Sequence, residues 1–295
     1  MFTAVVRIAK CGVGEIICIF LSKSAQSDNI RYMKIIDTHV HIYPDAIAEK
    51  AMESISNFYG LSVRNPCKIS DLVSNMRQNG IEKSVVCSVA TSKHQVCKIN
   101  DFMASCKSNP LFHPLATLHP DMDRDEITCE IARIKELGLK GLKIHPDCQS
   151  FKLNGERGRK LFDALGDFEL PILVHTGDRR FDFSHPEYMI DVARDYPHLT
   201  FVAAHFGGWT EWDQAMKYKG LKNVFFDTSS SLFRLDAHIA KTVIFGLGLD
   251  KFMFGTDFPM WKCTEEIERV LSLDLGEKNN EHIFSLNAKR VFKIE

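Results

Sequence analysis

The stretch from residue 139 to residue 177 contains the unit that decides the fold. It holds the apolar run "LKGLKIH" (139–145), the amphipathic segment "GERGRKLFDALGDFE" (155–169) and a second apolar run, "PILVHTG" (171–177). Short runs that are nearly continuous in apolar residues are typical of parallel strands covered on both faces. The segment between them has helical spacing, so the stretch predicts a strand, a helix and a second strand.

The same unit repeats along the chain. The six further apolar runs are "KIIDTH" (34–39), "KSVVCSV" (83–89), "FHPLATL" (112–118), "LTFVAAH" (199–205), "NVFFDTS" (223–229) and "KFMFGTD" (251–257). The further helical segments are 44–60, 68–80, 123–138, 185–197, 236–248 and 264–276. Eight such units predict an α/β fold, a single (β/α)8 TIM-type barrel, whose usual length is about 250 residues. The alternative is an open doubly wound sheet, but no GxGxxG or GxxxxGK[ST] motif follows a strand.

Composition narrows the class of partner. The 295 residues carry a formal net charge of −1, with 45% apolar and 25% charged residues, which is ordinary for a globular protein. This balance, and the lack of a Lys/Arg-rich run, argue against nucleic acid and membrane surfaces as partners. We therefore expect a small-molecule substrate, and a homodimer as the commonest form if the chain associates.

The N-terminal residues are expected to stand apart from the barrel. Residues 1–32 contain the apolar patch "IICIFL", which is too short to span a membrane and makes a poor signal peptide. We expect an N-terminal extension over 1–32 and the barrel domain over 33–295. The nine cysteines are irregularly spaced, odd in number and form no CxxC pair. This pattern predicts free thiols in a reducing compartment, and hence a cytoplasmic protein.

Side chains able to bind a metal follow several predicted strands. Barrels of this type carry their chemistry at the C-terminal ends of the strands. His39 and His41 are two residues apart and so point to one face of the first strand. A lone strand histidine is more often structural, and HxH alone is a weak signal. The joint pattern predicts a metal site with imidazole and carboxylate ligands, and its members are His39, His41, His175, His205 and Asp257.

Five segments together resemble a known family. They are "IIDTHVHIYP" (35–44), "GLKGLKIHP" (138–146), "LPILVHTGD" (170–178), "FVAAHFGG" (201–208) and "FMFGTDFPM" (252–260). The chain resembles the amidohydrolase superfamily over about residues 34 to 295, in particular the amidohydrolase-related group that includes aminocarboxymuconate semialdehyde decarboxylase. The segments occur in the family's order. They specify the superfamily much better than they specify a reaction.

The resemblance implies a divalent metal ion. Its ligands would be His39, His41, His175 and Asp257, and the ion would most often be zinc, with manganese or iron also compatible with these ligands. His205 would be a further ligand or the acid/base group. Asp257 would also be the usual base in the hydrolases of the family.

Two side chains on the fourth predicted strand have open roles. In two-metal members of the superfamily a strand-4 lysine is carbamylated and bridges the ions, and Lys143 could play that part. In one-metal relatives the lysine is a structural or substrate-side cation, and we favour one metal. His145 shares a face with Lys143 and could line the substrate pocket, or it could lie in the loop beside Pro146.

Further substrate-binding candidates lie on the loops after the strands. A carboxylated substrate calls for arginine, whose guanidinium binds carboxylate through two parallel hydrogen bonds. The arginine candidates are Arg179, Arg180 and Arg234, each of which could instead be a solvated surface charge. The aromatic candidates are Trp209, Trp212 and Trp261, which could wall the pocket or cover the barrel rim.

Two reactions fit this set of residues. The first is hydrolysis of a small amide, lactone or ester by a metal-activated water, with His205 and Asp257 as catalytic groups. The alternative is non-oxidative decarboxylation of a small carboxylated substrate by a carboxy-lyase. A metal-binding barrel without turnover is weaker because every expected ligand is present. A nuclease is weaker still because no basic groove is evident.

Overall fold

The strands form two parallel sheets in the computed structural model, which describes residues 34–60 and 65–295. The first sheet has the order β1 (Ile35–His41), β2 (Ile81–Cys87) and β3 (Phe112–Pro114). The second sheet has the order β4 (Ala116–Thr117), β5 (Leu142–Ile144), β6 (Ile172–Val174), β7 (Phe201–Ala203), β8 (Val224–Asp227) and β9 (Phe252–Met253). The predicted extension over 1–32 lies outside the described residues, and Lys34–Glu295 forms one compact unit.

Backbone hydrogen bonds join the two sheets at one side. β3 and β4 flank Leu115, whose N–H donates to Val86 O (2.9 Å) on β2. The next N–H, of Ala116, donates to Gly141 O (2.8 Å), just before β5. The two short pieces are therefore one bent strand that passes from one sheet to the other, and this strand is the predicted run 112–118.

Backbone hydrogen bonds also close the barrel at the other side. The Thr38 N–H of β1 donates to Phe254 O (2.9 Å), which follows β9. Farther along, the Asp257 N–H donates to His39 O (2.8 Å), and the His41 N–H donates to Phe258 O (2.8 Å). With the bent strand counted once, the described residues form eight parallel strands in a closed ring. The prediction of a (β/α)8 barrel is confirmed.

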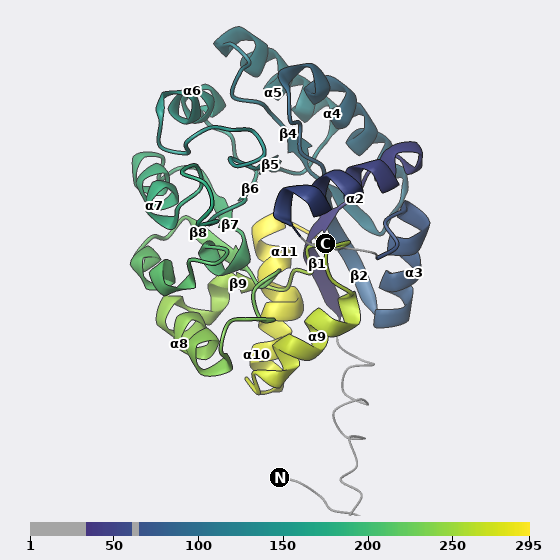
Figure 1. Cartoon of the computed structure of the whole chain (residues 1–295), viewed down its shortest axis with the longest axis vertical. Helices are drawn as coiled ribbons and strands as arrows, with labels where there is room; N and C mark the ends of the chain where they lie inside the picture. Colours follow the sequence, from purple (N-terminus) through teal and green to yellow (C-terminus); the bar gives the residue numbers. More distant parts are fainter. Residues whose placement is uncertain (1–33, 61–64) are drawn as a thin grey trace, which may run out of the picture. The chain divides into compact units, whose positions relative to one another are not determined.

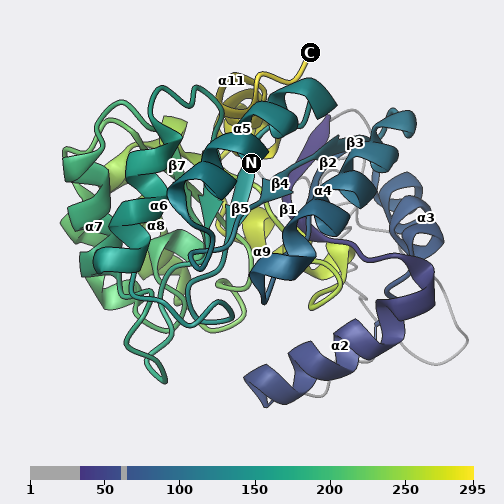
Figure 2. The ribbon, with the colours of Figure 1, turned by 90° about the horizontal axis from the view of Figure 1, so that it is seen from above.

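Helices surround this ring, except that the last of them lies across one end of it (Figure 1). They are α2 (Asp45–Tyr59), α3 (Ile69–Asn79), α4 (Val96–Ser105), α5 (Arg124–Leu137), α6 (Glu156–Leu165), α7 (Pro186–Asp195), α8 (Ala237–Leu247), α9 (Cys263–Ser272), α10 (Glu277–Glu281) and α11 (Asn287–Phe292). α2, α3 and α5 each end at a left-handed glycine, namely Gly60, Gly80 and Gly138. Figure 2 shows α2 standing out from the ring at the end where β1 finishes.

The C-terminal helix closes one end of the barrel. Buried side chains from the strands, including Ile36, Leu173 and Val202, pack with Ala288 and Phe292 of α11 in one apolar cluster. This packing leaves the opposite end, where the strands finish, as the place for chemistry.

The strands are shorter than their apolar runs predict. β6 ends at Val174 although the run continues to Gly177, and β7 ends at Ala203 although the run continues to His205. The backbone turns sharply at these places, with a positive φ of 80° at Gly177 and 60° at His205. His39 and His41 lie within β1, whereas His175, His205 and Asp257 lie one, two and four residues beyond the ends of their strands.

Two further expectations from the sequence concern the cysteines and the possibility of a membrane-spanning helix. The seven cysteines within the described ranges are free, as predicted. In the same ranges, no helix combines the length and the apolar character needed to cross a bilayer.

Glu266 of α9 should make the stability of the fold depend on pH. Its side chain is wholly buried, one oxygen pairs with Arg269, and the other has no partner within the described residues. Burial raises its pKa from the ordinary 4.5 to about 8, so the folded protein holds a proton that the unfolded chain releases. Between these values the free energy of unfolding should fall as pH rises, by up to about 1.4 kcal/mol per pH unit. Glu266→Gln should lose this slope in urea unfolding at pH 5, 6.5 and 8, and equal slopes in the two proteins would contradict the assignment.

Candidate active site

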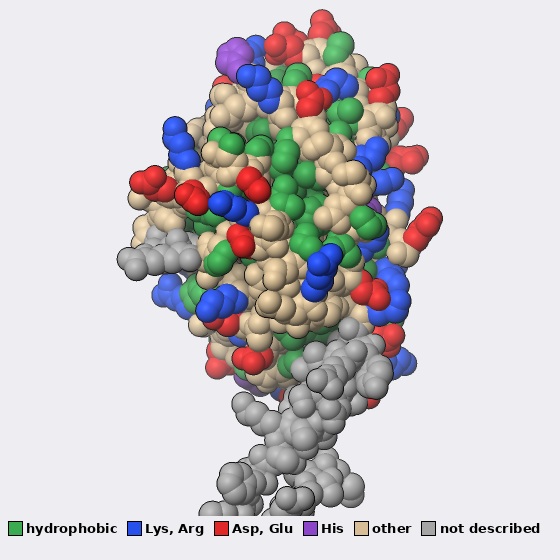
Figure 3. Space-filling view, turned by 90° about the vertical axis from the view of Figure 1, so that its right-hand side faces the viewer, with side chains coloured by type: hydrophobic (Ala, Val, Ile, Leu, Met, Phe, Trp, Pro, Cys, Tyr) green, Lys and Arg blue, Asp and Glu red, His purple; other side chains and the backbone are tan. Residues whose placement is uncertain are grey.

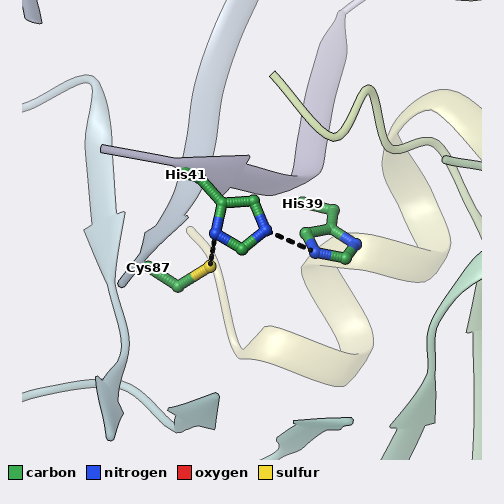
Figure 4. Close-up of side chains that lie close together, drawn as sticks. All are labelled: His39, His41 and Cys87. Atoms are coloured by element: carbon green, nitrogen blue, oxygen red, sulfur yellow. Dashed lines mark hydrogen bonds between the residues drawn. The ribbon is translucent and has the colours of Figure 1, made fainter. Parts of the chain in front are cut away.

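The two histidines of β1 meet the carboxylate of Asp257 at the mouth of the barrel. His39 Nε2 and His41 Nε2 are 3.2 Å apart, and Asp257 Oδ1 lies 3.5 Å from the first and 3.2 Å from the second. Figure 4 shows the two rings pointing toward each other, with Cys87 on the far side of His41. The i, i+2 spacing on β1 and the closure of the barrel together bring these three side chains to one point.

The other two predicted histidines join the same cluster. His205 Nε2 lies 3.1 Å from His175 Nδ1, and the His205 ring stacks on the His39 ring with centroids 5.1 Å apart. Side chains that follow β6, β7 and β9 thus meet those of β1. We call His39, His41, His175, His205 and Asp257 the histidine centre.

The outward nitrogens of these rings face acceptors. His39 Nδ1–H donates to Asp227 Oδ2 (2.9 Å), whereas its inward nitrogen, Nε2, accepts from the Lys143 ammonium (2.8 Å). His205 Nδ1–H donates to the carbonyl of Ser229 (3.1 Å). His175 Nε2 faces Asp147 Oδ2 at 3.4 Å. The hydrogen bonds of His39 and His205 fix tautomers in which their inward nitrogens carry lone pairs, the arrangement that second-sphere groups give to metal-binding histidines. His175 Nε2 forms no hydrogen bond within the described residues.

The charge states suit a cation at the histidine centre. Burial, with the nearby Lys143 ammonium, lowers the pKa of His39 to about 4, and burial also lowers the pKa of His175 and His205. Burial opposes ionisation of Asp257, but the surrounding imidazoles outweigh it and hold the pKa of this carboxyl well below its usual range. Neutral imidazoles beside an ionised carboxylate are the protonation states that metal ligands require.

His41 differs from the other rings. Burial lowers its pKa, but Cys87 and the Asp257 carboxylate outweigh burial and raise the pKa to about 9. At neutral pH this raised pKa gives His41 a proton that balances the charge of Asp257. A metal ion would take over that role and release the proton. The donor set therefore fits a divalent metal.

Lys143 and His145 contact different members of the histidine centre. Lys143 is wholly buried against His39. His145 lies in the loop after β5 and stacks flat on His175 with ring centroids 3.9 Å apart. Its Nδ1 accepts from the Cys148 N–H, and its Nε2–H donates to the Tyr59 hydroxyl oxygen (2.9 Å). The sequence left both roles open. The structure places Lys143 against His39 and His145 against His175.

A cavity of about 580 Å³ opens above the histidine centre. Its aromatic lining consists of Tyr59, Trp209, Trp212, Phe233 and Trp261. Trp209 packs edge-on against Tyr59, with centroids 5.3 Å apart, so the three tryptophans singled out in the sequence wall this cavity.

The three candidate arginines also line this cavity, but they differ in their partners. Arg179 is exposed and donates to Asp213 (2.5 Å), so it is tied to the rim. Arg180 donates to Asp178 (2.6 Å) and lies against four aromatic rings. Arg234 forms no ion pair with any residue in 34–60 or 65–295, and it alone of the three has a guanidinium free to bind a carboxylate. Arg179 was one of the candidates from the sequence, and its pairing with Asp213 makes it poorer than Arg234.

Four residues of the site were missed in the sequence. Asp227 ends β8 in the same way that the predicted ligands follow their strands, so the rule of strand ends could have found it. Asp147 and Ser229 lie in loops, where nothing in the sequence singled them out. Tyr59 is the last residue of α2, and no sequence signal places it beside His145, which is 86 positions away.

Comparison with solved structures shows the same fold in proteins of low sequence identity. 5-Carboxyvanillate decarboxylase from Sphingomonas paucimobilis is 17% identical, with a TM-score of 0.69 over 89% of this chain and 100% of that one. The same enzyme from Novosphingobium aromaticivorans, in complex with manganese and 4-hydroxy-3-methoxy-5-nitrobenzoic acid, is 18% identical, with a TM-score of 0.70 over 89% and 97%. A candidate 2-pyrone-4,6-dicarboxylic acid hydrolase from Pseudomonas putida is 16% identical, with a TM-score of 0.65 over 90% and 99%.

The comparison with curated proteins found no match to the chain. One family model does match the sequence, over nearly the whole described barrel. This family model, described as amidohydrolase, matches residues 36–294, which include every member of the histidine centre. The chain therefore belongs to the amidohydrolase family.

Proposed function

We propose that this protein is a metal-dependent, non-oxidative decarboxylase of a small aromatic carboxylic acid. The observation that carries the proposal is the cavity above the histidine centre, which has aromatic walls and a free arginine, Arg234. Such a cavity suits a flat ring that bears a carboxylate. The two decarboxylases of the same fold act on ligands of this shape, so we prefer decarboxylation to the hydrolysis that the sequence favoured.

We further propose that one divalent ion is held by His39, His41, His175 and Asp257. The close approach of His39 Nε2, His41 Nε2 and Asp257 Oδ1 supports three of these ligands, and His175 is linked to them through His205, which stacks on His39. Nitrogen and carboxylate donors suit zinc, manganese and iron, and the manganese-bound structure of the same fold makes manganese as strong a candidate as zinc. When bound, such an ion polarises an oxygen of the substrate as a Lewis acid.

The side chains of the chain have separate tasks in this proposal. Arg234 binds the carboxylate, and Trp209 and Trp261 sandwich the ring and exclude water. His205 Nε2 accepts a proton from a substrate hydroxyl and returns it to the ring carbon from which the carboxyl group departs as carbon dioxide. Its buried, neutral imidazole is suited to accept that proton, whereas the strongly held Asp257 carboxylate is a weak base.

Product analysis tests the reaction. The metal-loaded protein is incubated with 2,6-dihydroxybenzoate, with 5-carboxyvanillate and, separately, with 2-pyrone-4,6-dicarboxylate. Release of carbon dioxide with formation of the decarboxylated ring supports the proposal. Ring opening of the pyrone without loss of carbon dioxide would support hydrolysis instead. Hydrolysis is the second candidate because the Pseudomonas putida protein of the same fold is a candidate hydrolase.

Arg234→Ala should weaken substrate binding more than it slows the reaction. Loss of a charge-assisted hydrogen bond to a carboxylate should raise KM about 10- to 100-fold. The change in kcat should be smaller, because the histidine centre is untouched. Steady-state kinetics of Arg234→Ala and Arg194→Ala, an exposed arginine of α7, make the comparison. If KM stays at the wild-type value in both variants, Arg234 does not bind the substrate.

A further inference from the structure

A second cavity reaches the histidine centre from another direction. It has a volume of about 470 Å³ and lies between α2 and α4. Its inner end is formed by His41, His145, His175 and Asp257. Tyr59 lines both this cavity and the one above the centre, so the two spaces meet at the same reacting groups.

The walls of this second cavity are apolar along the length of α2. Ile47, Ala51, Ile55 and Tyr59 occupy every fourth position and so form one face of the helix. At 1.5 Å per residue, this face is about 18 Å long. Ile47 is half exposed at its outer end. We call this space the α2–α4 groove.

The opposite wall comes from α4 and the loop before it. Its apolar members are Val89, Ile99 and Phe102. Apart from Asp257 at the inner end, Lys98 is the sole carboxylate or ammonium group among the described lining residues, and it is exposed. Figure 3 shows apolar side chains gathered in the middle of the face formed by the helices on the right of Figure 1.

We propose that the α2–α4 groove binds an apolar chain attached to the substrate. The substrate class is then an aromatic acid with an alkyl or acyl substituent, whose acidic ring lies at the histidine centre and whose chain runs along α2. The proposal rests on the proposed function for the acidic ring. Continuity with the histidine centre identifies the occupant as substrate, because a ligand that fills the groove also touches His41 and His145.

Binding of a homologous series tests the groove without any turnover. The probes are 4-alkylbenzoates from 4-methyl- to 4-octylbenzoate, titrated by calorimetry into the manganese-loaded protein. If the chain enters the groove, each added methylene should tighten binding about three- to fourfold until the chain reaches solvent. Equal affinity across the series, or no binding by its long members, would overturn the proposal and leave the groove to another occupant.

A matched pair of variants locates the effect. Ala51→Trp fills the groove from α2, whereas Asn57→Trp adds the same side chain at an exposed position of α2 outside the lining. Ala51→Trp should bind 4-methylbenzoate within about twofold of the wild type and lose the gain from longer chains, and Asn57→Trp should keep that gain. A chain-length gain that persists in Ala51→Trp would overturn the proposal.

The outcome is separate from that of the proposed function. Decarboxylation is tested with 2,6-dihydroxybenzoate, which has no chain. Absence of carbon dioxide release together with a chain-length gain would refute the decarboxylase and support the groove. Carbon dioxide release with no chain-length gain would do the reverse.

Discussion

Replacing His205 with asparagine should lower the rate of carbon dioxide release by about 10²- to 10⁴-fold, the range expected for loss of a positioned acid/base group. The reason lies in the two nitrogens of the ring. Nδ1 is held by the carbonyl of Ser229, and Nε2 faces the histidine centre beside His175. Asparagine offers no group that takes up and returns a proton near neutral pH.

Bound metal measured on the same sample separates the two roles left open for His205. An acid/base group can be lost while metal content stays at the wild-type value, whereas a ligand cannot. His238→Asn is the control, since His238 is exposed at the start of α8. Loss of turnover together with loss of metal would make His205 a ligand, and unchanged turnover would remove it from the mechanism.

Removal of the metal should abolish turnover, and added manganese or zinc should restore it. Replacing Asp257 with asparagine should also abolish turnover, because the variant loses the sole carboxylate of the proposed ligand set and with it the bound metal. We expect metal affinity to fall by more than the 10- to 100-fold typical of outer-sphere changes. Elemental analysis after dialysis against chelator, with and without metal added back, gives the measurement.

Asp250→Asn provides the control for this experiment. Asp250 is an exposed aspartate in the turn before β9, on the same segment of chain as Asp257. This variant should keep wild-type metal content. If Asp257→Asn also kept its metal and its activity, the proposed ligand set would be wrong.

The histidine centre could be predicted from the sequence because its geometry follows from the strands. Each member lies in or just after an apolar run, and the ends of parallel strands in a ring must meet. His39 and His41 share a face by the period of the strand alone. Asp227 obeys the same rule, but its run continues into "TS", without a second metal-binding side chain to draw attention to it.

The substrate-binding residues could not be predicted in the same way. Their positions depend on how loops and helices fold over the mouth of the barrel, and the spacing in the sequence does not determine this. Arg179 and Arg234 look alike in the sequence, yet Arg179 is bound by Asp213 and Arg234 has no such partner among the described residues. Tyr59 reaches His145 because α2 lies over the strand ends, a matter of tertiary packing.

The hydrogen bond from the Asp257 N–H to His39 O links the histidine centre to the closure of the barrel. This bond belongs to the seam along which the first and last strands meet, and both residues also project their side chains into the histidine centre. An ion bound there would cross-link the two sides of the seam and so join the first strand of the barrel to the last. Loading the protein with metal should therefore slow hydrogen exchange at the amides of Thr38, His41 and Asp257 first, ahead of amides elsewhere in the ring.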